Sequence, residues 1–224
     1  MSTLAVALHH LRKDTRIEWR SKDATNAMLF FALLVAVIFS FAFDPSADES
    51  RRIVGGIVWI AFLFASTIAV NQTWTRELRN GVLDALRITP APLTSILVGK
   101  ALGNFAFVCL IQLLVWPVFV VFYNLRVLGS ITQLVGVLLL GTWALVMNGT
   151  FFTALSMRTR NREVMLPLLL FPIAIPALLA MVEATTAVLT GDASPFMWIK
   201  ILAGYDIVFT TIGVLLFETV LQAE

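Results

Sequence analysis

Long apolar runs, separated by short polar stretches, make up most of this chain. A helix needs about 20 apolar residues to cross the hydrocarbon core of a bilayer, and several runs reach or exceed that length. The pattern predicts an all-α, polytopic integral membrane protein in which residues 1–224 form a single domain with six transmembrane helices. We expect the six spans at about 24–43, 53–73, 96–123, 131–156, 164–189 and 201–221.

A shorter amphipathic stretch precedes the first apolar run. Its charged residues leave one helical face free of charge, which predicts an interfacial helix along the membrane surface with Trp19 at the level of the headgroups. A signal peptide is not expected, because the first apolar run is too long and no small-residue cleavage site follows it. The uncharged face is formed by Leu4, Leu8, Leu11, Thr15 and Trp19.

A second amphipathic stretch, residues 75–92 (TRELRNGVLDALRITPAP), lies between the second and third spans. It predicts a helix of about three turns, which ends before Pro90. A helix this short is marginal alone in water, so it either rests on lipid or docks on a protein. Charges of both signs on its polar face favour a protein surface. Its apolar face is formed by Leu78, Val82, Ala85 and Leu86, with Leu83 beside it.

Composition agrees with a membrane protein: 59% of the 224 residues are hydrophobic, 13% are charged and the mean hydropathy is +0.89. Of the sixteen Lys and Arg residues, twelve fall on the side of the spans that holds both termini and residues 75–92. The positive-inside rule therefore predicts that both termini are cytoplasmic. Lys100, at the start of the third span, is expected to reach the interface by snorkelling.

Few residues suggest a bound cofactor or a nucleic-acid partner. No basic tract or aromatic nucleic-acid module is present, so we expect no nucleic acid. The single cysteine, Cys109, lies inside an apolar run, and the two histidines, His9 and His10, lie near the N-terminus. These residues predict no metal site and no cofactor bound by this chain.

The fifth span contains Pro167, Pro172 and Pro176. Each proline removes a backbone donor and clashes with the preceding turn, so we expect a bent or broken helix. A static kink and a hinge or re-entrant turn along a substrate path are both compatible with this spacing.

Three carboxylates lie in or near the last two spans: Glu183, Asp206 and Glu218. A carboxylate within a span is costly and usually faces the protein interior or a water-filled cavity. Asp206, beside Tyr205 and inside the sixth span, is the strongest candidate of the three for a substrate path.

Three stretches resemble one family of membrane proteins: ELRNGVLDALRITP (77–90), RTRNREVMLPLLLFPIAIPALL (158–179) and AGYDIVFTTIGVLLFE (203–218). Six spans with a charged helix between the second and third are similar to the membrane subunit of type-2 ABC exporters. The three stretches are most similar to the B-subunit family of the haem exporter, the cytochrome c maturation permeases. Asp84 stands where the family pattern leads us to expect glutamate, which keeps the charge.

The resemblance implies a non-catalytic permease subunit in a bacterial inner membrane. Such a subunit couples ATP hydrolysis on a separate ABC ATPase to haem export or haem-chaperone release during c-type cytochrome maturation. The resemblance also implies a second copy of the chain and further maturation subunits, with haem as a transported or handled ligand. No GxxxxGK[ST] motif is present, so ATP would bind the partner. The implied ATPase-coupling residues are Glu77, Leu78, Gly81, Val82, Leu83, Asp84 and Leu86.

Other functions stay open at this stage. A type-2 exporter permease for a lipid, glycan or drug has the same architecture, although the proline spacing and AGYD favour the haem family. A haem-attaching lyase would be expected to carry outer-face histidines, and an intramembrane protease a Ser/His or paired-Asp arrangement. A scaffolding subunit is a further possibility, against which the mixed charges of residues 75–92 speak.

Overall fold

The computed structural model describes residues 3–43, 48–79, 93–125, 127–156 and 162–222. Every regular element in these ranges is a helix, and six of the helices are long and apolar enough to cross a membrane. The prediction of an all-α protein with six membrane-spanning helices is therefore confirmed. The helices are α1 (Thr3–Ser21), α2 (Asp23–Ala42), α3 (Asp48–Arg79), α5 (Leu93–Phe122), α6 (Ile131–Ser156), α7 (Arg162–Thr190) and α8 (Phe196–Gln222).

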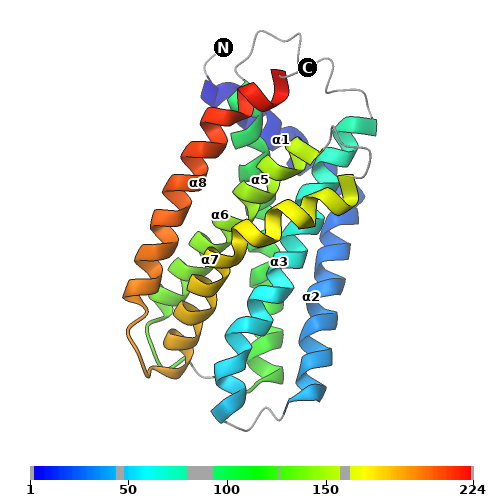
Figure 1. Cartoon of the computed structure of the whole chain (residues 1–224). Helices are drawn as coiled ribbons and strands as arrows, with labels where there is room; N and C mark the ends of the chain where they lie inside the picture. Colours follow the sequence, from blue (N-terminus) through cyan, green and yellow to red (C-terminus); the bar gives the residue numbers. More distant parts are fainter. Residues whose placement is uncertain (1–2, 44–47, 80–92, 126, 157–161, 223–224) are drawn as a thin grey trace.

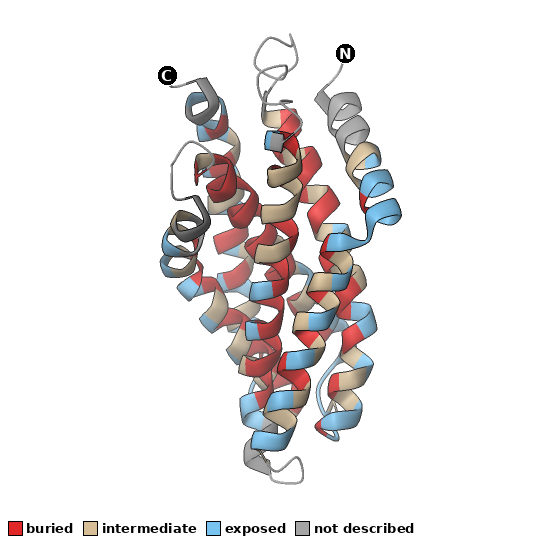
Figure 2. Ribbon diagram, turned by 90° about the vertical axis from the view of Figure 1, so that its right-hand side faces the viewer, coloured by how far each residue is buried: buried red, intermediate tan, exposed pale blue. Residues whose placement is uncertain are grey.

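The helices form an elongated bundle in which both ends of the described chain lie together, as an even number of crossings requires (Figure 1). We call this the α1 end, because α1 lies there, and the opposite end the far end. In the apolar windows of α3 and α6, 67% and 61% of residues are buried, against 22–39% in the other four spans. These two helices therefore form the centre of the bundle, and the outer faces of the others are exposed (Figure 2).

Side-chain hydrogen bonds join each of the two central helices to a neighbouring helix. Trp59 Nε1 on α3 donates to Thr185 Oγ1 on α7 at 2.8 Å. Gln112 Nε2 on α5 donates to Thr142 Oγ1 on α6 at 2.7 Å. Hydrocarbon offers no alternative partner to these groups, so such bonds help to fix which helices meet.

Close approach of α3 and α6 depends on Gly141. A Cβ at this position would overlap the fully buried ring of Trp59, and only glycine leaves that space. Small residues at helix contacts let backbones approach in membrane bundles, and here a single glycine admits the largest side chain of the core.

The far end is closed by the turn before α6. Gly129 N donates to Val188 O at 2.9 Å and Leu128 N donates to Leu189 O. These bonds satisfy carbonyls in the last turn of α7, which a helix leaves without partners. A Cβ on Gly129 would lie 2.8 Å from Val188 O, so the turn can reach α7 only with glycine there.

The fifth span is a single unbroken helix, although it contains three prolines. α7 runs from Arg162 to Thr190 and changes direction along its length, between its yellow and orange halves in Figure 1. The expected bend is present, and the helix crosses the bundle fully instead of turning back. Pro172 and Pro176 lie on its exposed side.

The second span is longer than expected. Its helix continues past 73 to Arg79, so residues 75–79 extend the span instead of starting a separate helix. The remainder of the predicted amphipathic helix, 80–92, lies outside the described residues.

Candidate functional site

Charged side chains from α1, from the end of α3 and from the start of α5 meet at the α1 end. The central residue is Lys100 in the second turn of α5, which is fully buried. Its Nζ donates to Glu77 Oε1 of α3 at 2.9 Å and to Asp14 Oδ2 of α1 at 3.4 Å. Lys13 of α1 also donates to Glu77 Oε1. We call these four residues the Lys100 cluster.

The expectation that Lys100 snorkels to the interface is therefore wrong. Snorkelling serves a lysine that has no partner in the apolar region, whereas Lys100 has two carboxylates within reach inside the protein. Its Nζ also lies 5.1 Å from the centre of the Trp74 ring, a cation–π distance. These partners replace the water that the ammonium group would otherwise seek.

A second group of ion pairs joins α1 to α3 and to the start of α2. Arg76 Nη1 pairs with Glu18 Oε2 at 2.8 Å. Glu18 Oε1 accepts hydrogen bonds from Thr25 N at 2.7 Å and from Thr25 Oγ1 at 2.9 Å. A carboxylate at a helix N-terminus satisfies a free N–H and interacts favourably with the helix dipole, so Glu18 fixes where α2 begins.

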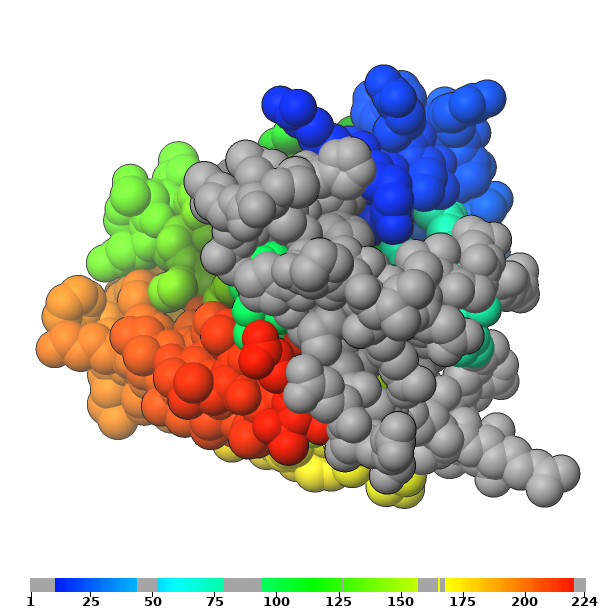
Figure 3. All heavy atoms as spheres, turned by 90° about the horizontal axis from the view of Figure 1, so that it is seen from above, coloured from blue at the N-terminus to red at the C-terminus, as the bar shows by residue number. Residues whose placement is uncertain are grey.

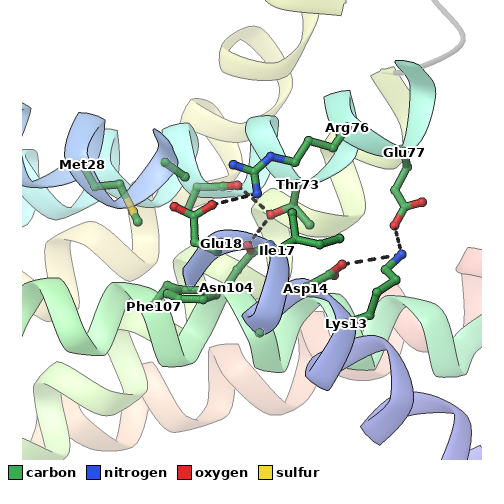
Figure 4. Close-up of a pocket in the computed structure, with 13 residues that line it drawn as sticks. Lys13, Asp14, Ile17, Glu18, Met28, Thr73, Arg76, Glu77, Asn104 and Phe107 are labelled. Carbon is green, nitrogen blue, oxygen red and sulfur yellow. Dashed lines mark hydrogen bonds and ion pairs between the residues drawn. The ribbon is translucent and has the colours of Figure 1, made fainter. Parts of the chain in front are cut away.

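A cavity of about 140 Å³ lies between these two groups of ion pairs (Figure 4). One wall is polar, and the other is apolar and includes Met28 and Phe107. Asn104, which is 3% exposed, accepts a 2.7 Å hydrogen bond from Thr73 through Oδ1. Its Nδ2 has no partner within the described part of the chain. The charges around the cavity are of both signs and are already paired, so the cavity shows no preference for an ion of either sign.

α1 separates its charges between two faces. Asp14 and Glu18 point toward α3 and α5, whereas Arg12, Arg16 and Arg20 are exposed. Trp19 is also 70% exposed, and its expected place at the level of the headgroups stays a prediction. Of the uncharged face predicted from the sequence, Leu11 packs near Gly103 of α5, whereas Thr15 and Trp19 are exposed and the side chains of Leu4 and Leu8 lie outside the described part of the structure. Asp14 and Glu18 also face the neighbouring helices, where ion pairs with Lys100 and Arg76 offset the cost of their burial.

Of the predicted coupling residues, the structure describes two. Glu77 is 4% exposed and points into the Lys100 cluster, and Leu78 is 38% exposed. The other five, Gly81, Val82, Leu83, Asp84 and Leu86, lie outside the described residues. The Lys100 cluster was missed at the sequence level, although Lys100, an isolated charge within an apolar run, was the available signal.

The other predicted residues lie deeper in the bundle, where α6, α7 and α8 meet. Tyr205 Oη donates to Ile173 O of α7 at 2.9 Å and accepts from Asn148 Nδ2 of α6 at 3.2 Å. The bond to Ile173 lies between Pro172 and Pro176, at the bend of α7. Tyr205 therefore ties the bend to α6 and α8, so the structure brings this part of the predicted path together.

Asp206 is 7% exposed, and neither carboxylate oxygen has a hydrogen-bond partner among the described residues. No group of three or more His, Cys, Asp or Glu able to hold a metal ion occurs in the described ranges.

Comparison with known proteins places the chain among bacterial membrane proteins. Residues 5–223 match the family described as "CcmB protein". "Heme exporter protein B" of Rhodobacter capsulatus is 31% identical over 169 residues, which cover 75% of this chain and 77% of the relative. The proteins of the same name in Bradyrhizobium diazoefficiens and Pseudomonas aeruginosa are 28% and 26% identical, over 91% of this chain in each case.

Six membrane-spanning helices and these bacterial relatives identify a multi-pass protein of the bacterial inner membrane. The match extends over nearly the whole chain, from α1 to α8. It therefore includes the ion pairs at the α1 end and the residues around Tyr205. The chain therefore belongs to the CcmB protein family.

Proposed function

We propose that this chain is the permease subunit of an ATP-driven complex that exports haem, or releases a haem-loaded chaperone, during c-type cytochrome maturation. The observation that carries the proposal is near-complete coverage of relatives named "Heme exporter protein B". The chain would supply the moving membrane part of the complex, and ATP would bind a separate ABC ATPase subunit, because the sequence contains no GxxxxGK[ST] motif.

In this proposal the α1 end faces the cytoplasm. Most of the Lys and Arg residues belong to segments at that end, as the positive-inside rule requires of the cytoplasmic side. Residues 80–92, which join α3 to α5, would then meet the ATPase with their apolar residues, including Val82, Leu83 and Leu86. Glu77 would act indirectly, because it is buried within the chain.

Haem would be handled in passing and not held at a fixed site. Haem iron takes His, Met, Cys or Tyr as axial ligands. The only two histidines, His9 and His10, are in α1 and outside the spans. Mechanical work on a haem-binding partner, or transient passage along the path near Tyr205 and α7, agrees with this distribution. A second copy of the chain and other maturation subunits complete the proposed complex.

The proposal is tested by co-purifying the chain with its candidate ATPase from detergent extracts. Leu83→Asp with Leu86→Asp is expected to abolish association, since two buried charges at a docking face are costly. The matched control is Leu128→Asp with Ile131→Asp, which adds the same charges at exposed positions of the far end and is expected to leave association intact.

Two further quantities are measured besides association with the ATPase: the ATPase rate, and the yield of c-type cytochrome in cells that depend on this chain. Loss of all three with the first variant, while the protein still inserts, supports the proposal. Unchanged association with that variant contradicts the proposed docking face. A normal cytochrome yield in cells that lack the chain contradicts the role in cytochrome maturation.

A further inference from the structure

We propose that Lys100 is a positioning residue that locks α1 to the ends of α3 and α5, so that these three segments move as one body when the ATPase acts. The inference rests on the proposed function and adds to it the route by which displacement spreads from the connection between α3 and α5.

The first step is connectivity. The segment that carries the proposed ATPase-docking residues follows Arg79, the last residue of α3, and precedes Leu93, the first residue of α5. Glu77 lies in the last turn of α3 and Lys100 in the second turn of α5, and their 2.9 Å hydrogen bond joins the two ends directly. A push on this connection therefore acts on two helix ends that this pair of side chains holds together.

The second step adds α1. Lys13 and Asp14 are successive residues of α1. Asp14 pairs with Lys100, and Lys13 pairs with Glu77. α1 lies directly against α5 here, since a Cβ at Gly103 would be in ordinary van der Waals contact with Leu11 Cδ1, at 3.6 Å. α1 is thus attached to the base of the connection by charge, in addition to its covalent link to α2.

The third step is the cost of separation. Lys100 and Glu77 are 0% and 4% exposed, so pulling them apart would leave buried charges without partners, which is far more costly than losing a surface pair. Rigid movement of the joined segments avoids this cost. Packed elements that move do so as bodies and not by continuous deformation.

The fourth step extends the body toward α8. Trp74, beneath the Lys100 ammonium group, lies with its ring centre 6.3 Å from that of Phe217 near the end of α8. Seen from the α1 end, α1 in blue and the end of α8 in red lie on separate sides of the molecule (Figure 3). Lys100 and Trp74 together thus connect opposite sides of this end.

The variant that tests the inference is Glu77→Gln with Lys100→Met. It removes one charge of each sign and leaves Lys13 and Asp14, 3.6 Å apart, to pair with each other. Removing both partners of a buried pair is tolerated better than removing one, so this variant is expected to fold and to bind the ATPase. The matched control is Lys200→Met, which removes an equally charged lysine at the far end.

The readout is the distance between spin labels in the permease–ATPase complex in lipid nanodiscs, without nucleotide and after trapping with ATP and vanadate. Cys109→Ser removes the native thiol, and labelled chains are diluted with unlabelled ones. One pair, Arg16→Cys with Thr94→Cys, reports α1 against α5. The other, Arg16→Cys with Leu139→Cys, reports α1 against the exposed face of α6.

In the chain with Lys100 intact, and in the Lys200→Met control, trapping is expected to change the α1–α6 distance and to leave the α1–α5 distance constant. In the double variant the α1–α5 distance is expected to change instead. Cytochrome yield per ATP hydrolysed is expected to fall about tenfold, which is the size of effect that a lost link between coupled elements can have, while ATPase association is kept.

The same distance changes in the double variant as in the intact chain would overturn the inference and leave the proposed function standing. Failure of the unmodified chain to bind the ATPase, or to change either distance on trapping, would overturn the proposed function as well. These outcomes are distinguishable, because the first is seen only in the variant and the second in the unmodified chain.

Discussion

At the scale of single residues, two positions hold the centre of the bundle together. Gly141 admits the ring of Trp59 between α3 and α6, and Tyr205 fastens the bend of α7 to α6 and α8. Neither role follows from residue type, since glycine and tyrosine are common in membrane helices for other reasons. Both roles depend on which atoms the fold brings opposite them.

Gly141→Ala is expected to destabilise the protein by about 1–3 kcal/mol, because the new methyl group overlaps the buried ring of Trp59. Gly136→Ala is the matched control. It lies in the same helix with nothing within 4 Å of an added Cβ, and alanine favours helix over glycine. Thermal unfolding in detergent measures both variants, and equal melting temperatures would contradict the close contact.

Tyr205→Phe is expected to cost about 1 kcal/mol, since it removes a donor to Ile173 O and an acceptor for Asn148 Nδ2. Phenylalanine keeps the stacking on Phe209, whose ring centre is 4.2 Å away, so the effect isolates the hydroxyl group. Thermal unfolding and hydrogen exchange across α7 measure it. An unchanged exchange rate near the bend would show that the hydroxyl group does not hold α7.

At the scale of elements, the packing of α1 decides the character of the α1 end. Helical periodicity correctly predicts that α1 is a helix, but it does not predict that Asp14 and Glu18 face cations of α3 and α5. Periodicity cannot find such pairs, because it counts buried residues as apolar. The opposite charges that make burial possible are contributed by residues more than 50 positions away, Arg76 for Glu18 and Lys100 for Asp14.

Glu18→Ala is expected to loosen α1 and the first turn of α2, because it removes both the partner of Arg76 and the acceptor for Thr25 N. A lost hydrogen bond to a charged group costs about 1.5–3 kcal/mol, so amide exchange in these turns should rise about tenfold or more. Arg16→Ala, at an exposed position of α1, serves as control and should exchange like the unmodified chain. Exchange that rises equally in both variants would contradict the anchoring role of Glu18.

At the scale of the whole molecule, the bundle has two chemically different ends. The α1 end carries the ion-pair clusters and the cavity, while the far end is closed by backbone hydrogen bonds and by the exposed pair Arg52–Asp192. The positive-inside rule predicts that the α1 end faces the cytoplasm. Labelling of the protein in the membrane tests this prediction.

Single cysteines at Arg16 and at Asp192, each in a Cys109→Ser background, are expected to react differently with a membrane-impermeant maleimide. In intact cells with a permeable outer membrane, Asp192→Cys should be labelled and Arg16→Cys should be protected until the inner membrane is opened. Both positions are exposed in the structure, so burial does not explain a difference. The reverse labelling pattern would invert the proposed topology.

The sequence by itself determined that this is an all-helical protein with six spans, where those spans lie, and which family it belongs to. These properties depend on runs of apolar residues and on short motifs, which are local and can be read directly. Only the tertiary structure decided that Lys100 is buried in a charge cluster, that Glu77 points inward, and that α7 bends without breaking. The physical reason is that a buried charge or a freed carbonyl in a span is tolerated only when a group on another helix binds it. Packing in three dimensions decides which group that is.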